Sequence, residues 1–154
     1  MFSKEERKAL HEAFWTEFKR FINKDANAEG KRIKWLRYPT KVKEIYIRLT
    51  IDSKTATFSI DIQAKDDGIR ALIWEQFTEL KVVLENKMGT DGSWEEIAYN
   101  DAGQVISQIK WTLEGVSIYN KNDRDKAFNF FRKHLLSFDR FYCEYADILI
   151  NLAN

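Results

Sequence analysis

Residues 44–63 read EIYIRLTIDSKTATFSIDIQ, and this stretch decides the fold class of the chain. Apolar and polar side chains alternate along residues 44–51 and again along residues 56–63, with a short polar break at residues 52–54. Alternation with a period of two on both sides of a break is typical of an antiparallel hairpin. The sequence therefore predicts a hairpin with one apolar face that packs on a core and one polar face.

The polar face of this hairpin brings charged side chains close together. With the apolar side chains of both arms on one face, Glu44 lies opposite Gln63 and Tyr46 lies opposite Asp61. Arg48 is then diagonal to Asp61, at a separation that a long side chain can span. We expect a cross-strand salt bridge between Arg48 and Asp61.

Three segments carry apolar residues at the spacing of a helix. The first begins at Ser3, which can form a capping box with Glu6, and runs to about Ile22. The second runs from about Ile69 to Gly89, a residue type that commonly follows a helix C-terminus. The third occupies most of the last thirty or so residues and is described below with its apolar stripe.

The remaining alternating segments predict strands. One short strand is expected at residues 33–36, at an edge because Pro39 follows it. A second hairpin is expected from residues 94–99 and 105–113. The order is α-βββ-α-ββ-α, so we predict a single α+β domain over residues 1–154, with a mostly antiparallel sheet of about five strands and three helices.

The composition is that of a folded, soluble protein without a strong overall charge. The 154 residues include 25 basic and 24 acidic side chains, so attraction to nucleic acid or to a membrane must come from a local patch. The single cysteine excludes an intrachain disulfide. The first residues, MFSKEERKAL, are too charged for a secretion signal, and no apolar run approaches the roughly 20 residues of a membrane span. We expect a cytoplasmic protein with no membrane partner.

The sequence contains no motif for a cofactor or a metal. His11 and His134, together with Cys143, cannot complete a zinc site of four His and Cys ligands. The glycines do not form a phosphate-binding loop. We therefore expect no cofactor and no bound metal. His134 is expected to be partly exposed beside Lys133, and Cys143 is expected to be a packed thiol.

Five segments resemble a known family. They are FWTEF (14–18), KWLRYPTKVKEIYIRL (34–49), GIRALIWEQFTELKVVLE (68–85), LEGVSIYNKND (113–123) and FDRFY (138–142). The family consists of prokaryotic uncharacterised domains of about 150 residues, found alone or at the C-terminus of larger proteins, some of them nuclease-like. The resemblance implies an α+β fold, but the family has no agreed activity or catalytic residues, so it assigns no site. It also implies a nucleic-acid-related or defence context, by association alone.

A basic and aromatic segment precedes the first hairpin. Residues 31–43 contain six Lys or Arg and no acid, with Trp35 and Tyr38 among them. Cations contact phosphates and exposed rings stack on bases, so our main hypothesis is a non-catalytic recognition module that binds nucleic acid. The contact residues would be Lys34, Arg37, Tyr38, Lys41, Lys43 and Arg48. The alternative for this segment is a solvated edge, where lysines prevent the addition of another strand.

The polar face of the hairpin provides an enzymatic alternative, a degenerate metal-dependent nuclease. Residues 61–65, DIQAK, resemble the acid-x-lysine element of such enzymes, in which carboxylates hold a divalent metal and a lysine stabilises charge. The weak catalytic candidates are Glu44, Asp61, Gln63 and Lys65. Glu44 with Gln63 is a small ligand set for a metal, so we expect binding rather than catalysis.

The final helix provides a third hypothesis, a homodimeric protein–protein adaptor. This helix begins at Asn122 or Asp123, and its apolar residues follow steps of three and four. They are Phe128, Phe131, Leu135, Phe138, Tyr142, Tyr145 and Leu149. Phe130, Phe141 and Ile148 widen the stripe, so the helix is expected to be covered on two sides, either by its own chain or by a second copy.

Overall fold

The computed structural model describes residues 2–153 as an α+β fold with one four-stranded antiparallel sheet and four α-helices. The strands are β1 (Ile45–Ile51), β2 (Thr55–Ile62), β3 (Ser93–Tyr99) and β4 (Val105–Glu114). The helices are α1 (Lys4–Ile22), α2 (Asp67–Glu79), α3 (Lys81–Met88) and α4 (Arg124–Ala153), with 3₁₀ turns η1 (Trp35–Arg37) and η2 (Lys121–Asp123). The strand order is β1-β2-β4-β3, so β1 and β3 are the edges. No helix in this part of the chain is long and apolar enough to cross a membrane.

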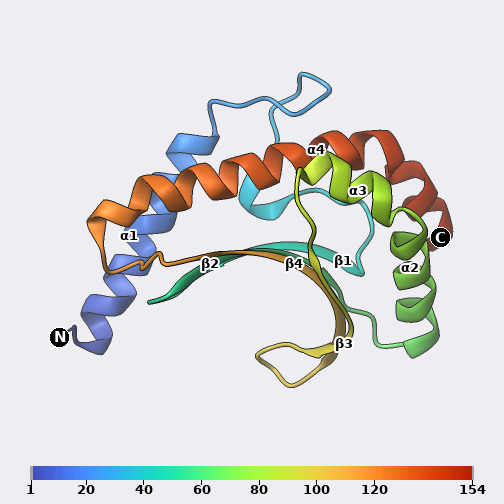
Figure 1. Cartoon of the computed structure of the whole chain (residues 1–154), viewed down its shortest axis with the longest axis horizontal. Helices are drawn as coiled ribbons and strands as arrows, with labels where there is room; N and C mark the ends of the chain where they lie inside the picture. Colours follow the sequence, from blue (N-terminus) through green and yellow to red (C-terminus); the bar gives the residue numbers. More distant parts are fainter. Residues whose placement is uncertain (1, 154) are drawn as a thin grey trace.

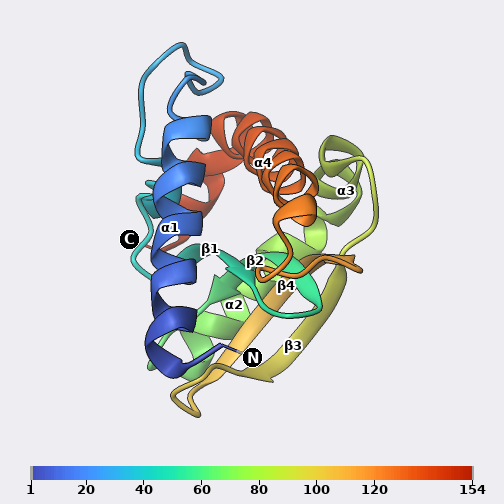
Figure 2. The ribbon, with the colours of Figure 1, turned by 90° about the vertical axis from the view of Figure 1, so that its left-hand side faces the viewer.

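The helices cover one face of the sheet and leave the other face free. In Figure 1, α4 runs above the strands along the length of the sheet, and the sheet bends away from this helix toward β3. Figure 2 shows that α1 lies beside α4 at its C-terminal end and runs from there past the edge of the sheet. The free face of the sheet is therefore the inner face of its bend.

The first hairpin has the predicted pairing. Tyr46 is paired with Asp61, and the backbone N–H of Gln63 donates to the carbonyl of Glu44 at 2.8 Å. The predicted salt bridge is also confirmed, because Arg48 Nε lies 3.1 Å from a carboxylate oxygen of Asp61. The apolar set of β2 faces the helices and is completely buried, so alternation assigned both faces of this hairpin correctly.

The turn of this hairpin is held by one carboxylate. Asp52 accepts hydrogen bonds from the backbone N–H groups of Lys54 and Thr55, each at 2.8 Å. These bonds favour the charged form of the carboxylate and lower its pKa below the ordinary value. The polar break in the sequence is thus a side-chain-stabilised turn, as is common for Asp at such positions.

The core lies between the sheet and the helices, and aromatic rings dominate it. Phe58 of β2 is completely buried, and its ring centroid lies 5.9 Å from that of Phe138 in α4. On another side of α4, the Phe131 ring lies 5.6 Å from Phe18 of α1. The buried members of the predicted α4 stripe are Phe128, Phe131, Leu135, Phe138, Tyr142 and Leu149. The stripe is therefore covered by its own chain on two sides, so its apolar character does not require a second copy.

The expected strand at residues 33–36 is not present, and the sheet has four strands instead of about five. Trp35 starts the 3₁₀ turn η1, and its indole N–H donates to the carbonyl of Asp25 at 3.0 Å. The Trp35 ring is buried, whereas the flanking Lys34 and Leu36 are exposed. Trp35 is thus held by its buried ring and by a hydrogen bond to a loop residue, and neither contact requires an extended strand. The alternation of apolar residues in the sequence could not indicate these contacts.

The expected second helix is two helices, so the fold has four helices instead of three. The break falls at Leu80, whose backbone angles (φ −93°, ψ 6°) leave the helical range at the end of α2. Phe77 of α2 and Leu84 of α3 are both completely buried. The break allows the apolar residues of both α2 and α3 to pack on the core. The sequence around Leu80 contains no Gly or Pro that would indicate a helix break.

A buried carboxylate ties the irregular segment between α1 and β1 to α4. Asp139 is 1% exposed and accepts hydrogen bonds from the Tyr38 hydroxyl and from the backbone N–H of Ala28, both at 2.6 Å. Burial and the neighbouring Asp139 raise the pKa of Tyr38 above its ordinary value, so this hydroxyl remains a donor. Burial and the same carboxylate raise the pKa of the Cys143 thiol to about 11, in agreement with an inert, packed thiol.

This arrangement predicts that Tyr38→Phe destabilises the protein. The substitution removes a hydrogen bond to a buried charged group, and we expect it to lower the free energy of unfolding by about 1.5–3 kcal/mol. Urea denaturation measures the difference. Tyr99→Phe is the matched control, because Tyr99 is 69% exposed and should change stability by less than about 0.5 kcal/mol. Equal stability of the Tyr38→Phe variant and the wild type would contradict the role of this bond.

His134 is buried, so the prediction that it is partly exposed is wrong. It is 5% exposed and lies in van der Waals surroundings of Phe58, Trp111 and Phe130. Its Nδ1 lies 2.8 Å from the Phe130 carbonyl oxygen and must carry a proton, while Nε2 has no hydrogen-bond partner among residues 2–153. Burial lowers the pKa of His134 below 6.5, and the nearby charge of Lys133 lowers it further.

Stability is therefore expected to fall as the pH falls below about 6.5, the ordinary pKa of histidine. In that range the unfolded chain binds a proton that the folded chain resists, so protonation favours unfolding. The positive charge of Lys133, the adjacent residue of α4, adds to the cost of protonating the imidazole. Chemical denaturation between pH 7 and pH 5 measures the trend.

We expect His134→Leu to reduce this pH dependence, whereas His11→Leu, which alters the other histidine, should leave it as in the wild type. A His134→Leu variant that loses stability with acid as steeply as the wild type would refute the assignment.

Candidate functional site

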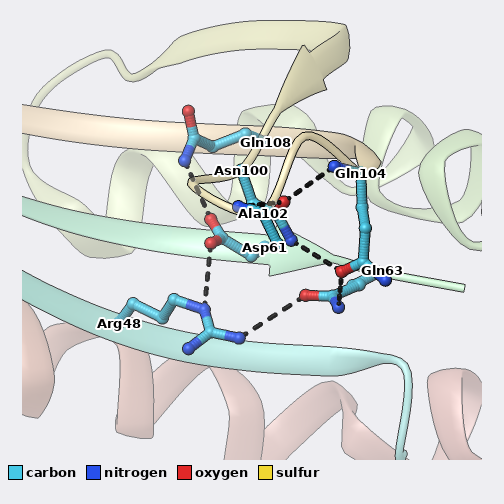
Figure 3. A network of polar contacts seen from close by, with 7 residues as sticks. All are labelled: Arg48, Asp61, Gln63, Asn100, Ala102, Gln104 and Gln108. Atoms are coloured by element: carbon cyan, nitrogen blue, oxygen red, sulfur yellow. Dashed lines mark hydrogen bonds and ion pairs between the residues drawn. The ribbon is translucent and has the colours of Figure 1, made fainter.

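The free face of the sheet carries a polar network centred on Asp61 (Figure 3). Asp61 is 4% exposed although no helix covers this face. One of its oxygens lies 3.1 Å from Arg48 Nε on β1, and the other accepts from Gln108 Nε2 on β4 at 3.0 Å. Since β2 lies between β1 and β4, one side chain links three strands across the free face.

A second part of this network reaches the turn between β3 and β4. The amide of Gln63 donates to Gln104 Oε1 at 2.7 Å, and Asn100 Nδ2 donates to the same oxygen at 3.0 Å. The Arg48 guanidinium contacts Gln63 Oε1 at 3.5 Å, which joins the two parts. Figure 3 shows these side chains in a continuous chain along the end of the sheet.

This network occupies the groups that the nuclease hypothesis needs for a metal. Both oxygens of Asp61 and the amide of Gln63 already have protein partners. Glu44 and Lys65 lie beyond them, at the end of the hairpin, and line a separate cleft. Within residues 2–153, no group of three or more His, Cys, Asp or Glu side chains is placed to hold a metal ion. The four candidates are therefore near one another but do not form one carboxylate cluster.

The cleft at this end of the free face has a volume of about 680 Å³. Glu44, Tyr46, Gln63 and Gln104 line its sheet side, and the first turn of α2 lines the other side. Glu44 is 8% exposed, whereas Tyr46 is 42% exposed. The cleft therefore combines a sheltered carboxylate with an accessible aromatic ring.

The basic segment, residues 31–43, is anchored on α4 through Tyr38 and Thr40, and its second half borders β1. All six of its cations are exposed: Lys31, Arg32, Lys34, Arg37, Lys41 and Lys43. None of them has an ion-pair partner in the part of the chain that the structure describes. The segment therefore presents uncompensated positive charge, and Arg37, Lys41 and Lys43 bring it beside Tyr46 and Arg48 of the free face.

Two hollows flank the 3₁₀ turn of the basic segment. One, of about 560 Å³, lies between this segment and the end of α1, and Lys19, Arg32, Lys34 and Arg37 contribute to its lining. Its acid, Asp25, is bound at both oxygens by Arg132, at 2.8 and 2.9 Å. Since that carboxylate is already neutralised, the cations in this hollow can act on a bound anion.

The other hollow is a groove of about 720 Å³ between the second half of the basic segment and the start of β1, and its lining residues run from Leu36 to Arg48. Within it, Lys41 has a φ of +62°, a left-handed conformation that is uncommon for a residue with a side chain. The neighbouring Thr40 hydroxyl, which lies 2.8 Å from the Val42 carbonyl oxygen and 2.9 Å from that of Ile45, holds this turn. The backbone thus carries local strain at a cationic position.

The six predicted binding residues fall into two groups. Lys34, Arg37, Lys41 and Lys43 are exposed and unpaired within the described residues, as a phosphate contact requires. Tyr38 is half-buried, and its hydroxyl is committed to Asp139. Arg48 is committed to Asp61 and stacks at 4.7 Å on the exposed ring of Tyr46. The structure therefore offers Tyr46, rather than Tyr38, as the ring that a ligand can reach.

Lys19 and the cleft role of Glu44 were not predicted from the sequence. Lys19 lies in the last turn of α1, where a basic residue is common simply because it complements the helix dipole. Glu44 was considered only as a metal ligand. Its low exposure and its place in the wall of a cleft are tertiary features, which local sequence does not reveal.

The Asp61 network predicts a measurable cost for Asp61→Ala. Arg48 and Gln108 would lose their shared acceptor, and we expect the free energy of unfolding to fall by about 1–3 kcal/mol. Denaturation with urea tests this value. Thr50→Val on the same face is the control, since Thr50 is exposed and should change stability little. The network would be energetically irrelevant if both variants were as stable as the wild type.

The chain was compared with known protein families, curated proteins and solved structures. The family described as Domain of unknown function (DUF4268) matches residues 10–146, which include every strand, α2, α3, most of α1 and most of α4. No curated protein and no solved structure was found to match. The match covers far more than half of the chain, and so the chain belongs to the family Domain of unknown function (DUF4268).

Proposed function

We propose that this chain is a non-catalytic recognition domain that binds single-stranded nucleic acid through residues 31–43 and the adjacent free face. The observation that carries the proposal is the set of six exposed cations without described ion-pair partners. Unpaired Lys and Arg side chains can replace the counterions of a phosphate backbone, and the released counterions drive binding. Protection of a sheet edge against the addition of another strand, which is the alternative role of this segment, would need only a few lysines.

The distribution of charge supports a local rather than a general attraction. The whole chain has a net charge of +1, and the basic segment alone contains six of the 25 basic residues. The rest of the chain is therefore net acidic. A polyanion would be attracted to one side of the molecule and repelled by others, which orients it on the basic segment.

The basic segment is also rigid enough to serve as a preformed surface. Trp35 donates to the carbonyl of Asp25, at the start of the same loop, and Tyr38 donates to Asp139 of α4. The carbonyl of Thr40 accepts from the Tyr142 hydroxyl at 2.6 Å. A loop that is ordered before binding loses less conformational freedom on binding, and so more of the interaction free energy appears as affinity.

A single strand fits these features better than a duplex. Tyr46 presents an exposed ring beside the groove along β1, with the Arg48 guanidinium stacked on it. Aromatic rings and Arg planes bind unstacked bases, which a duplex does not expose. The expected partner is therefore a flexible strand whose phosphates follow the cations and whose bases reach Tyr46.

Charge reversal at Arg37 and Lys41 is expected to weaken binding. With a labelled 12-nucleotide single strand, the Arg37→Glu/Lys41→Glu variant should bind at least about tenfold more weakly than the wild type at low salt, because two phosphate contacts become repulsive. The slope of log K against log[salt] should decrease in magnitude by about 1.4, at about 0.7 per lost contact with a single strand. Fluorescence anisotropy over a salt series measures both values.

The matched control is Lys8→Glu/Lys126→Glu, which makes the same change in net charge on exposed residues of α1 and α4 away from the basic segment. An equal loss of affinity in this control would show a non-specific charge effect. Absence of binding by the wild type at low salt would overturn the proposal.

A further inference from the structure

Glu44 is a sheltered carboxylate without a protein partner. The residue is 8% exposed as a whole, and its side chain makes no hydrogen bond or ion pair with any other residue in the range 2–153. Its backbone continues the ladder to Gln63, and the adjacent Ile45 is buried toward the helices, so alternation directs the Glu44 side chain to the free-face side. The oxygens of Glu44 are not among the fully buried polar atoms that lack a partner, so they open into the cleft and are free to accept hydrogen bonds from a bound molecule.

The other acids near this cleft are already engaged. Asp67 forms an ion pair with Arg70 at 2.6 Å. The Asp66 side chain caps α2 by accepting from the backbone N–H of Ile69 at 3.0 Å. Glu44 is therefore the carboxylate of the cleft that remains available to a bound molecule.

The surroundings of Glu44 disfavour a cationic ligand. Lys43 and Lys65 also line the cleft, and both are exposed and lack an ion-pair partner in the described chain. They would repel an ammonium group or a metal ion, but they would attract a phosphate. The ligand is thus a molecule that presents neutral N–H donors to Glu44 and carries negative charge nearby.

Among the nucleobases, guanine matches a carboxylate best. Its N1–H and its exocyclic amino group present two parallel donors, which the two oxygens of one carboxylate can accept together. Adenine and cytosine place an acceptor nitrogen beside their amino donor, and uracil has one donor between two carbonyls. Each of these bases would direct at least one lone pair toward Glu44.

The cleft also supplies a stacking surface and a connection to the basic segment. Tyr46 lines both the cleft and the groove along β1, and Lys43 is likewise common to the two. A strand whose phosphates follow the groove can therefore place a base in the cleft beside the Tyr46 ring. The volume of about 680 Å³ lies within the usual range of small-molecule sites.

We propose that this cleft binds a guanine base, with Glu44 accepting hydrogen bonds from N1–H and the exocyclic amino group. This inference rests on the proposed function for its expected source, which is a guanine within a single strand. The same chemistry is present in a free guanine nucleotide, and the experiment separates the two.

The test uses the full chain and labelled oligouridine strands that carry one central guanine, adenine, cytosine or hypoxanthine. We expect the guanine strand to bind about tenfold more tightly than the adenine and cytosine strands, since a bidentate pair gives discrimination of this order. Hypoxanthine lacks the amino group and should fall between them. Equal affinity for all four strands would exclude a guanine within a strand as the source and leave the proposed function standing.

The Glu44→Gln variant tests the assigned residue. It keeps the shape of the side chain but replaces one acceptor oxygen by a donor, so the guanine preference should be lost while the affinity for plain oligouridine remains. Glu96→Gln is the control, because Glu96 is exposed and distant in the sheet order from β1. Retention of the full guanine preference by Glu44→Gln would overturn the assignment. The thermal midpoint of the variant verifies that it folds.

Calorimetric titration with guanosine monophosphate and adenosine monophosphate separates the two sources. Binding of the guanine nucleotide, lost in Glu44→Gln, supports the cleft even when no strand binds, and in that case the proposed function fails alone. Failure of both the guanine nucleotide and the guanine strand to bind preferentially would overturn the inference.

Discussion

The packing of β2 against α4 is the constraint on which both faces of the sheet depend. Phe58 on the helix side of β2 is completely buried and meets Phe138 and His134 of α4. Because successive residues of a strand point to opposite faces, this contact places Asp61 on the free face. A shift of β2 by one residue would exchange the two faces, so burial of one ring fixes the position of the polar network.

The first hairpin and the first helix could be predicted because local signals determine them. The alternation around residues 52–54 gave the pairing of Tyr46 with Asp61, and the Ser3–Glu6 capping box and Gly89 are present as expected. The predictions of a strand at residues 33–36 and of one unbroken second helix were wrong, because tertiary packing determines the structure of both segments. Nothing near Leu80 in the sequence marks a helix end, and the break becomes understandable only when both halves are packed on the core.

The exposed cations of the candidate site could be predicted from the sequence, but the positions of its aromatic residues could not. A run of cations without acids is expected to be exposed, and Lys34, Arg37, Lys41 and Lys43 are exposed. The position of Tyr38 depends on Asp139, which lies about a hundred residues further along the chain. No local pattern indicates such a pair. His134 shows the same limitation, since its aromatic surroundings come from β2, β4 and its own helix.

The attachment of the loop at Asp139 has a consequence for its dynamics. One carboxylate holds Ala28 near the start of the loop and Tyr38 near its end, so both ends of this stretch depend on the same residue of α4. Release of both ends would free the intervening stretch as one cooperative unit while the sheet stays intact. Amide exchange between Ala28 and Tyr38 would then follow one common opening equilibrium, which would move Lys31, Arg32, Lys34 and Arg37 together.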